Sequence, residues 1–298
     1  MKGNNMVVVD YASVPPTPEI RRRSTGTHMA NYDRIYAKSL KDSTDQLKEA
    51  ADDPKAAVQK YLAMYENENV DYVLIKAKDC RTTFGVTIRN EDVAEFCHAN
   101  GPRYVGMAGV DPNRGMDAVR ELEYAVKELG LIGLNIQCFE CKVNATDPIM
   151  YPLYAKCIEL DVPVNLHMGM SFSSMAPMSH GKPIDLDKVM VDMPELKVIA
   201  GDPGFPWVHE MIGVAWRHRN VYIGLNAIKP KLFTTPNSGY EALLQYGARM
   251  LQDQMICGTN WPLMPVDSYF EAVRKLPLSE EIRGKWTGGN AAEVLKLG

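Results

Sequence analysis

Short apolar runs rich in β-branched residues alternate along the chain with longer segments of mixed polarity. Several of these runs are apolar at consecutive positions, which is typical of parallel strands that are covered on both faces. Parallel strands need long crossover connections, and eight of them can close into a barrel around their own side chains. The pattern therefore predicts an α/β protein with a (β/α)8 barrel, the TIM-barrel fold. The eight expected strands are 7–10, 72–75, 104–108, 133–137, 162–166, 197–200, 221–225 and 255–258.

The segments between these runs carry helical spacing, and 117–129 is the clearest example. Val119, Leu122 and Val126 form one apolar stripe there, with charged residues on the other positions, as in a helix that packs one face on a core. Gly130 follows, and glycine often ends a helix. We expect further helices at 90–99, 151–160, 208–216, 239–251 and 267–276, and a closing helix at 290–297.

Two strand-to-helix connections are long, at about 13–44 and 168–183. Loops of this length in a compact domain usually serve function, and both would lie at the barrel mouth. The first contains the basic triplet at 21–23, which we expect to be solvated. No linker, internal repeat or low-complexity tract interrupts the β/α pattern, so we expect residues 1–298 to form a single domain.

Composition narrows the choice of partners. With 298 residues and 46% hydrophobic content, the chain can bury one large core. A formal net charge of −4, spread without long runs, argues against nucleic acid and against an anionic membrane. No stretch approaches the roughly 18 apolar residues of a membrane-spanning helix, and the first residues lack a signal-like apolar stretch. We therefore expect a cytoplasmic protein that acts on a small molecule, with its six cysteines mostly reduced.

Polar residues that end the predicted strands are the candidates for chemistry, because a β/α barrel carries its active site at the carboxyl ends of its strands. His167 stands out, since it follows the run 162–166 directly and should point into the mouth, where an imidazole can act as a base. The polar strand ends are Asp10, Lys76, Gln137, His167, Asp202, Asn226 and Asn260.

Four segments resemble, in order, motifs of the amidohydrolase-related (amidohydrolase 2) family of TIM-barrel metal-dependent hydrolases. The resemblance implies the barrel fold, and it implies a divalent metal that the family binds through the histidine at the position of His167. The four segments are VPVNLHMG at 162–169, VIAGDPGFPW at 198–207, ICGTNWPL at 256–263 and NAAEVL at 290–295.

The positions where the family holds its metal carry other residues in this chain. Ala12 and Val14 replace a His-x-His pair in the first strand, and neither can bind a metal. Asp202 stands where a histidine is expected, and Asn260 replaces an aspartate that serves as general base or metal ligand. Because a catalytic zinc site normally has three protein ligands, we expect no cofactor. The alternative is a divalent metal, Zn, Mn or Fe.

We therefore expect a hydrolase or decarboxylase-like lyase that acts on a small organic acid or carbonyl substrate. Its catalytic groups would be His167, Asp202 and Asn260, with the first two as acid and base. The residues expected to bind the substrate are Tyr11, Lys76, Gln137 and Trp261.

Two alternatives remain open. The chain could be a non-catalytic subunit that pairs with an active, metal-bearing homologue, as in dinuclear-metal oxygenases such as 2-aminoisobutyrate hydroxylase. A new metal site could also use Cys138, Cys141 and His167, although no second Cys/His pair of comparable spacing is present and two reduced thiols are the simpler interpretation. We expect a homo-oligomer, or a hetero-oligomer with a related barrel.

Overall fold

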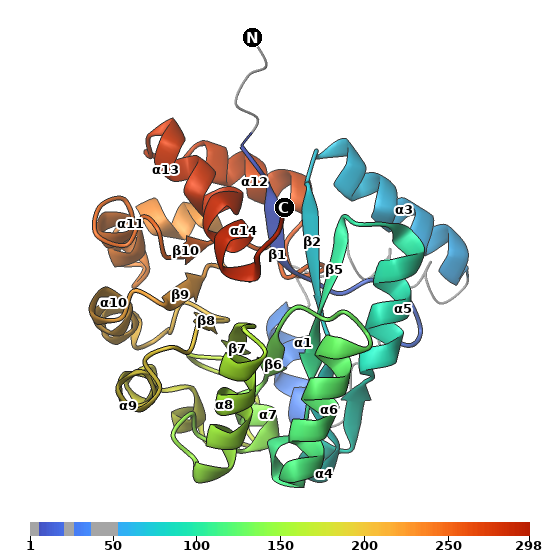
Figure 1. Ribbon diagram of the computed structural model, residues 1–298. Coiled ribbons are helices and arrows are strands. Elements are labelled where there is room, and N and C mark those ends of the chain that lie inside the picture. Colours follow the sequence, from blue (N-terminus) through green and yellow to red (C-terminus); the bar gives the residue numbers. More distant parts are fainter. Residues whose placement is uncertain (1–5, 21–26, 37–52) are drawn as a thin grey trace.

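A computed structural model describes residues 6–20, 27–36 and 53–298 of the chain. One sheet contains eight strands whose spatial order follows the sequence, and every pairing between neighbours is parallel (Figure 1). Each expected strand overlaps one of them, so the predicted barrel is confirmed. The strands are β1 (Val9–Ser13), β2 (Tyr72–Lys76), β5 (Tyr104–Gly109), β6 (Leu134–Ile136), β7 (Val164–Leu166), β8 (Val198–Ala200), β9 (Val221–Gly224) and β10 (Met255–Ile256).

The last strand returns to the first and nearly closes the barrel. The amide of Tyr11 donates to the carbonyl of Cys257 at 3.3 Å, and the amide of Val14 donates to the carbonyl of Trp261 at 3.0 Å. Because β10 is only two residues long, side chains add to this closure, as described below for Asp10.

Helices form the outer layer and connect successive strands (Figure 1). Those of seven or more residues are α1 (Ala30–Tyr36), α3 (Pro54–Asn67), α5 (Asn90–Asn100), α6 (Met116–Lys127), α8 (Tyr151–Glu159), α9 (Ile184–Asp192), α10 (Val208–Arg217), α11 (Glu241–Gly247) and α12 (Val266–Arg274). The shorter ones are η1 (Thr27–Met29), α4 (Arg81–Phe84), η2 (Pro112–Arg114), α7 (Cys138–Cys141), η3 (Pro148–Met150), η4 (Met178–Gly181), η5 (Pro230–Thr234), α13 (Glu280–Gly284), the π-helix η6 (Lys285–Gly289) and α14 (Asn290–Leu295).

The expected helices are present, and most of their ends lie within two residues of the predicted positions. The exception is the segment predicted at 239–251, in which α11 ends at Gly247. The ring of Trp286 packs there, 2.4 Å from the place that a Cβ on Gly247 would take. Helix α3 was not predicted, although Asp53 caps it by accepting from the amide of Ala56 at 3.0 Å and Pro54 begins it.

A small hairpin follows β2 and was also not predicted. Its strands, β3 (Lys78–Cys80) and β4 (Val86–Ile88), pair antiparallel and place Lys78 at the barrel mouth. Inside the barrel, apolar side chains of alternating positions form a dry layer that includes Val9, Leu74 and Ile256. Helix α14 packs on this layer and joins the two ends of the chain.

The two long connections lie at the mouth where they are described. In the first, η1 and α1 bring Met29 and Tyr32 to the cavity described below, whereas the basic triplet at 21–23 lies outside the described residues, as do 37–44. The second contains η4 and contributes Met170 and Phe172. Among the described helices, none is both long and apolar enough to cross a membrane. The single domain remains a prediction.

Candidate active site

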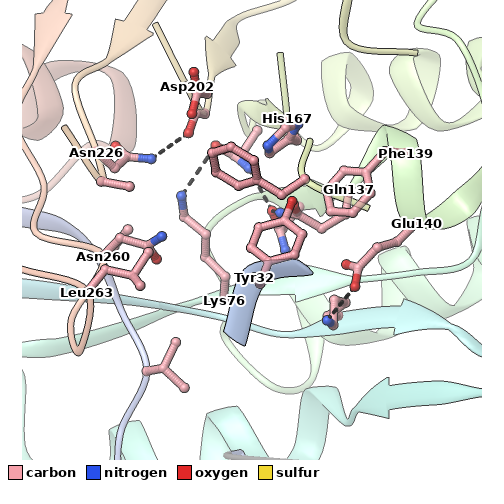
Figure 2. A pocket seen from close by; sticks show the side chains of 18 of the residues that line it. Tyr32, Lys76, Gln137, Phe139, Glu140, His167, Asp202, Asn226, Asn260 and Leu263 are labelled. Carbon is pink, nitrogen blue, oxygen red and sulfur yellow. Dashed lines mark hydrogen bonds and ion pairs between the residues drawn. The ribbon is translucent and has the colours of Figure 1, made fainter. Parts of the chain in front are cut away.

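A cavity of about 220 Å³ opens at the carboxyl ends of the strands (Figure 2). Lys76 rises from the end of β2 into its middle, with Asp202, Asn226 and Asn260 on one side and His167 on the other. The structure therefore brings the predicted catalytic residues into one place. It lies where β/α barrels carry their active sites.

The amine of Lys76 is held by neutral groups. It donates to Oδ1 of Asn165 at 3.3 Å and lies 3.7 Å from the centroid of the Tyr11 ring. The Tyr11 hydroxyl donates to the same oxygen at 2.5 Å, and Nδ2 of Asn165 donates to Oδ1 of Asn135 at 2.6 Å. Burial lowers the pKa of Lys76 to about 7, against the opposing effect of the Asp10 carboxylate.

His167 lies directly after β7, as the run before it predicted. Its Nδ1 is buried and has no hydrogen-bond partner among the described residues. The edge of the ring meets Phe139 at a centroid distance of 4.9 Å. Burial lowers the pKa of His167 to about 4, and the Glu140 carboxylate opposes this shift. The imidazole is therefore neutral near pH 7.

Asp202 follows β8 at the rim of the cavity. Its Oδ1 accepts from the amide of Gly204 at 3.2 Å, and no cation of the described chain lies within ion-pair distance. Burial raises the pKa of Asp202 to about 8. The carboxyl group can therefore hold a proton near neutral pH, as acid catalysts in apolar sites do.

Two asparagines complete this side of the cavity. Asn226 donates from Nδ2 to the carbonyl of Gly201 at 2.5 Å, which leaves its buried Oδ1 without a partner among the described residues. Asn260 has φ 50°, in the left-handed region that asparagine tolerates better than most residues. Both amides can offer hydrogen bonds to a polar ligand.

An aromatic wall covers the opposite side of the cavity and was not predicted from the sequence. The ring of Tyr32 stacks on Phe139 at 6.2 Å and meets the edge of Phe172 at 5.4 Å. These three rings come from α1, from α7 and from the loop after β7, so only the fold brings them together. They suit the apolar body of a small ligand.

Beside this wall lies a buried ion cluster. Oε1 of Glu140 accepts from Nζ of Lys78 at 2.9 Å and lies 3.3 Å from Nε2 of His28. Although burial opposes its ionisation, these two groups lower the pKa of Glu140 to about 2. His28 also stacks on Phe84 at 4.1 Å. The cluster therefore ties the first long connection to the loop after β6.

Two of the residues predicted to bind substrate lie elsewhere. Gln137 and Lys76 line the cavity, but Tyr11 is fully buried beneath Lys76. Trp261 does not line the cavity, and its role in substrate binding stays a prediction. Its ring packs on Tyr61 at a centroid distance of 5.0 Å.

Asn135 and Asn165 belong to the site and were missed. Each stands in the middle of an apolar strand and is buried, yet both line the cavity. A lone amide within a strand whose other residues are apolar is a signal that sequence can give, because a buried amide needs hydrogen-bond partners.

The residues of the cavity do not fit the divalent metal that the family implies. Ala12 and Val14 line the cavity and offer no ligand atom. Within 6–20, 27–36 and 53–298, no three His, Cys, Asp or Glu side chains form a group that could hold a metal ion.

The alternative site built on cysteines is not assembled either. Cys138 and Cys141 are buried outside the cavity, and Sγ of Cys141 donates to the carbonyl of Asp79 at 3.6 Å. Burial raises the pKa of Cys138 to about 12 and raises the pKa of Cys141 well above its usual range, so both remain thiols. They form no metal-binding group with His167.

The fold and this cavity define a TIM barrel with an enzyme-like site at the carboxyl ends of its strands. The sequence matches the family model described as amidohydrolase over residues 18–297, so the chain belongs to the amidohydrolase family. Gamma-resorcylate decarboxylase of Polaromonas sp. (strain JS666) is 25% identical over 252 residues, which are 70% of this chain and 75% of that protein. The predicted family is confirmed, and so is the prediction of an enzyme of the hydrolase and lyase kind.

Two solved structures share the fold. The uncharacterized TIM-barrel protein Bb4693 from Bordetella bronchiseptica gives a TM-score of 0.79 at 21% identity, over 97% of this chain and 98% of that one. A 5-carboxyvanillate decarboxylase from Novosphingobium aromaticivorans DSM 12444 gives a TM-score of 0.63 at 16% identity, over 98% of this chain and 97% of that one. The latter was crystallised with manganese and 4-hydroxy-3-methoxy-5-nitrobenzoic acid.

Proposed function

We propose that this protein is a decarboxylase-like lyase or hydrolase that acts on a small organic acid in the cavity around Lys76. One observation carries the proposal: a buried amine shares a small cavity with His167 and Asp202, opposite a wall of aromatic rings. The decarboxylase relative and the crystallised decarboxylase support the same class of reaction.

The residues suit separate tasks in such a reaction. Lys76 binds an oxygen of the substrate, while Asn226 and Asn260 offer further hydrogen bonds. The rings of Tyr32 and Phe139 pack on the apolar body of the ligand, which favours a planar or cyclic acid. His167 and Asp202 hold and move the proton that replaces the lost carboxyl group.

We further propose that the reaction does not use the metal of the family. Ala12, Val14 and Asn260 stand where the resemblance expects two histidines and an aspartate. In its protonated form, Lys76 supplies positive charge to the same cavity. An ammonium group stabilises negative charge on substrate oxygens without a metal ligand set.

Assays of the purified full-length chain test this function. We expect release of CO2 from at least one acid in a panel of ortho-hydroxybenzoates, 5-carboxyvanillate and β-keto acids, with no loss of rate after EDTA treatment. His167→Asn and Asp202→Asn should each lower the rate by about 100-fold or more. His209→Asn and Asp267→Asn change exposed residues of the same types and should leave it unchanged.

Elemental analysis separates the outcomes. Stoichiometric metal that is lost in His167→Ala would overturn the metal-free part of the proposal. Activity that appears only after a related, metal-bearing barrel is added would replace it with the subunit alternative. Light scattering of the purified chain measures the predicted oligomer in the same preparation.

A further inference from the structure

Two lysines line the cavity, and their surroundings differ in one decisive way. Nζ of Lys78 forms an ion pair with the Glu140 carboxylate at 2.9 Å. Nζ of Lys76 has no carboxylate of the described chain within ion-pair distance, and its hydrogen bond goes to the neutral amide oxygen of Asn165. A buried amine without a counter-ion is the form of lysine that acts as a nucleophile toward carbonyl groups.

We propose that Lys76 is a nucleophile that forms an imine with the keto group of a β-keto acid and thereby promotes its decarboxylation. The proposal rests on the proposed function, because it uses the same cavity, and it names the class of substrate. It also explains how a barrel without the family's metal ligands can stabilise the electrons that the departing carboxyl group leaves behind.

The position of the amine supports this role. Lys76 reaches the middle of the cavity (Figure 2). Its amine donates to Oδ1 of Asn165 at 3.3 Å, and the Asn165 amide is itself fixed by a hydrogen bond to Oδ1 of Asn135 at 2.6 Å. The Tyr11 ring closes the space on the barrel side, where it is fully buried. The amine is therefore aimed at the cavity by its neighbours, and a keto carbon can approach it only from the open side.

The proposed steps need no oxidant, reductant or co-reactant other than water. The nitrogen of neutral Lys76 bonds to the keto carbon, and after proton transfer the keto oxygen leaves as water, which yields a protonated imine. The bond to the carboxylate carbon then breaks, CO2 departs, and the electron pair forms an enamine with the nitrogen. A proton from Asp202 or His167 is added to the carbon, and water hydrolyses the imine to release the ketone and the amine.

The amine must be unprotonated in part near neutral pH. Burial of Lys76, with a pKa of about 7, meets this condition. The charged and titratable groups around it are Asp10 and Tyr11 from β1, His167 after β7 and Asp202 after β8. Of these, Asp10 raises the pKa of Lys76 and does not outweigh the burial.

Reductive trapping tests the proposal. The folded full-length chain is incubated with acetoacetate and sodium cyanoborohydride, which reduces imines, and the modified lysines are located by peptide mass spectrometry. We expect Lys76 to be labelled about tenfold faster or more than exposed lysines at pH 7, because a larger fraction of its amine is neutral. Lys78 is the matched internal control, since it lines the same cavity but is paired, and it should stay unlabelled.

Two variants test whether the label depends on the amine of Lys76 and on its surroundings. Lys76→Arg removes the label and keeps the charge. Asn165→Asp places a carboxylate beside the amine, so the labelling of Lys76 should slow at least tenfold at pH 7. The pH at which the labelling rate reaches half of its maximum should also move upward. Circular dichroism of each variant confirms that the fold is kept.

The mass of the adduct distinguishes this proposal from the proposed function. An adduct on Lys76 that has lost CO2 supports both the imine and the proposed decarboxylase function. An adduct that retains the carboxylate, with no CO2 released, supports the imine and contradicts decarboxylation. CO2 release that persists in Lys76→Arg, or labelling of Lys76 no faster than that of exposed lysines, would overturn the imine.

Discussion

At the scale of single residues, the cavity contains buried groups whose ionisation lowers the free energy of unfolding. Lys76 and Asp202 both lie in surroundings that disfavour their charged forms, and their pKa values move in opposite directions, to about 7 and about 8. Active sites commonly hold such groups at the expense of stability. Part of the stability of the barrel is therefore given up where its chemistry is expected to occur.

Replacement of Lys76 by methionine should stabilise the protein in a way that depends on pH. The native pKa of about 7 lies below the ordinary lysine pKa of 10.5, so between these values the unfolded chain holds a proton that the native protein has released. Wild-type stability therefore rises with pH across this window on account of Lys76. We expect Lys76→Met to be more stable by about 2 kcal/mol at pH 6, after allowance for solvent in the cavity.

Urea unfolding at pH 6 and at the upper end of this window measures the difference. The gain in stability should shrink as the pH rises toward 10.5, the ordinary pKa of lysine. Lys188→Met, on the exposed surface of α9, serves as the control and should show no such trend. A gain that is the same at both pH values would contradict a depressed pKa at Lys76.

At the scale of elements, neighbouring strands approach closely where a glycine follows β8. A Cβ on Gly201 would lie 2.6 Å from Oδ1 of Asn165, the oxygen that holds the amine of Lys76. The amide of Gly201 also donates to the carbonyl of Leu166 at 2.8 Å. Glycine at this position therefore allows the floor of the cavity to form between β7 and β8.

Gly201→Ala should lower the free energy of unfolding by about 1–3 kcal/mol, because the added methyl group must displace Asn165. We expect the same variant to slow the reductive labelling of Lys76. Gly213→Ala is a matched control, since nothing lies within 4 Å of a Cβ at that position in α10. That change should stabilise the protein by about 0.5–1 kcal/mol, as alanine does within a helix. Equal effects in urea unfolding would contradict the close approach.

At the scale of the whole molecule, a buried carboxylate helps to hold the two ends of the sheet together. Asp10 on β1 accepts from the amide and the hydroxyl of Thr259, at 2.8 and 2.6 Å. The hydroxyl of Tyr65 donates to it at 2.7 Å. Burial raises the pKa of Asp10, and these hydrogen bonds oppose the shift. This contact joins residues 249 positions apart, so it links the first strand of the barrel to the segment that follows the last.

Thr259→Val should destabilise the protein by about 2–3 kcal/mol. Valine has the shape of threonine but no hydroxyl, so the buried carboxylate of Asp10 loses one hydrogen bond. The matched control is Thr235→Val, whose exposed hydroxyl donates to the carbonyl of Lys231 at 2.9 Å and should matter by about 0.5 kcal/mol or less. Urea unfolding followed by circular dichroism and by tryptophan fluorescence measures both.

The same curves test the expected single domain. In the wild type, the two signals should report one coincident transition, and Thr259→Val should shift that transition as a whole. Separate transitions would show that the ends of the chain unfold independently.

The strands were predictable because most of them are runs of apolar residues that are buried on both faces, and such runs can be recognised from neighbouring residues alone. The hairpin of β3 and β4 was not, since β3 (Lys78–Cys80) contains a lysine and an aspartate and therefore forms no apolar run. The packing of Trp261 on Tyr61 could not be predicted either, because these two residues lie 200 positions apart in the chain.

By itself, the sequence determined the fold, the family, and the set of polar residues at the strand ends, because these depend on local patterns and on short motifs. Only the tertiary structure decided which of these residues share a cavity, that Asn165 rather than a carboxylate holds Lys76, and that three rings from distant segments form the opposite wall. Partners and burial set the charge of an amine, and both depend on residues far apart in the chain.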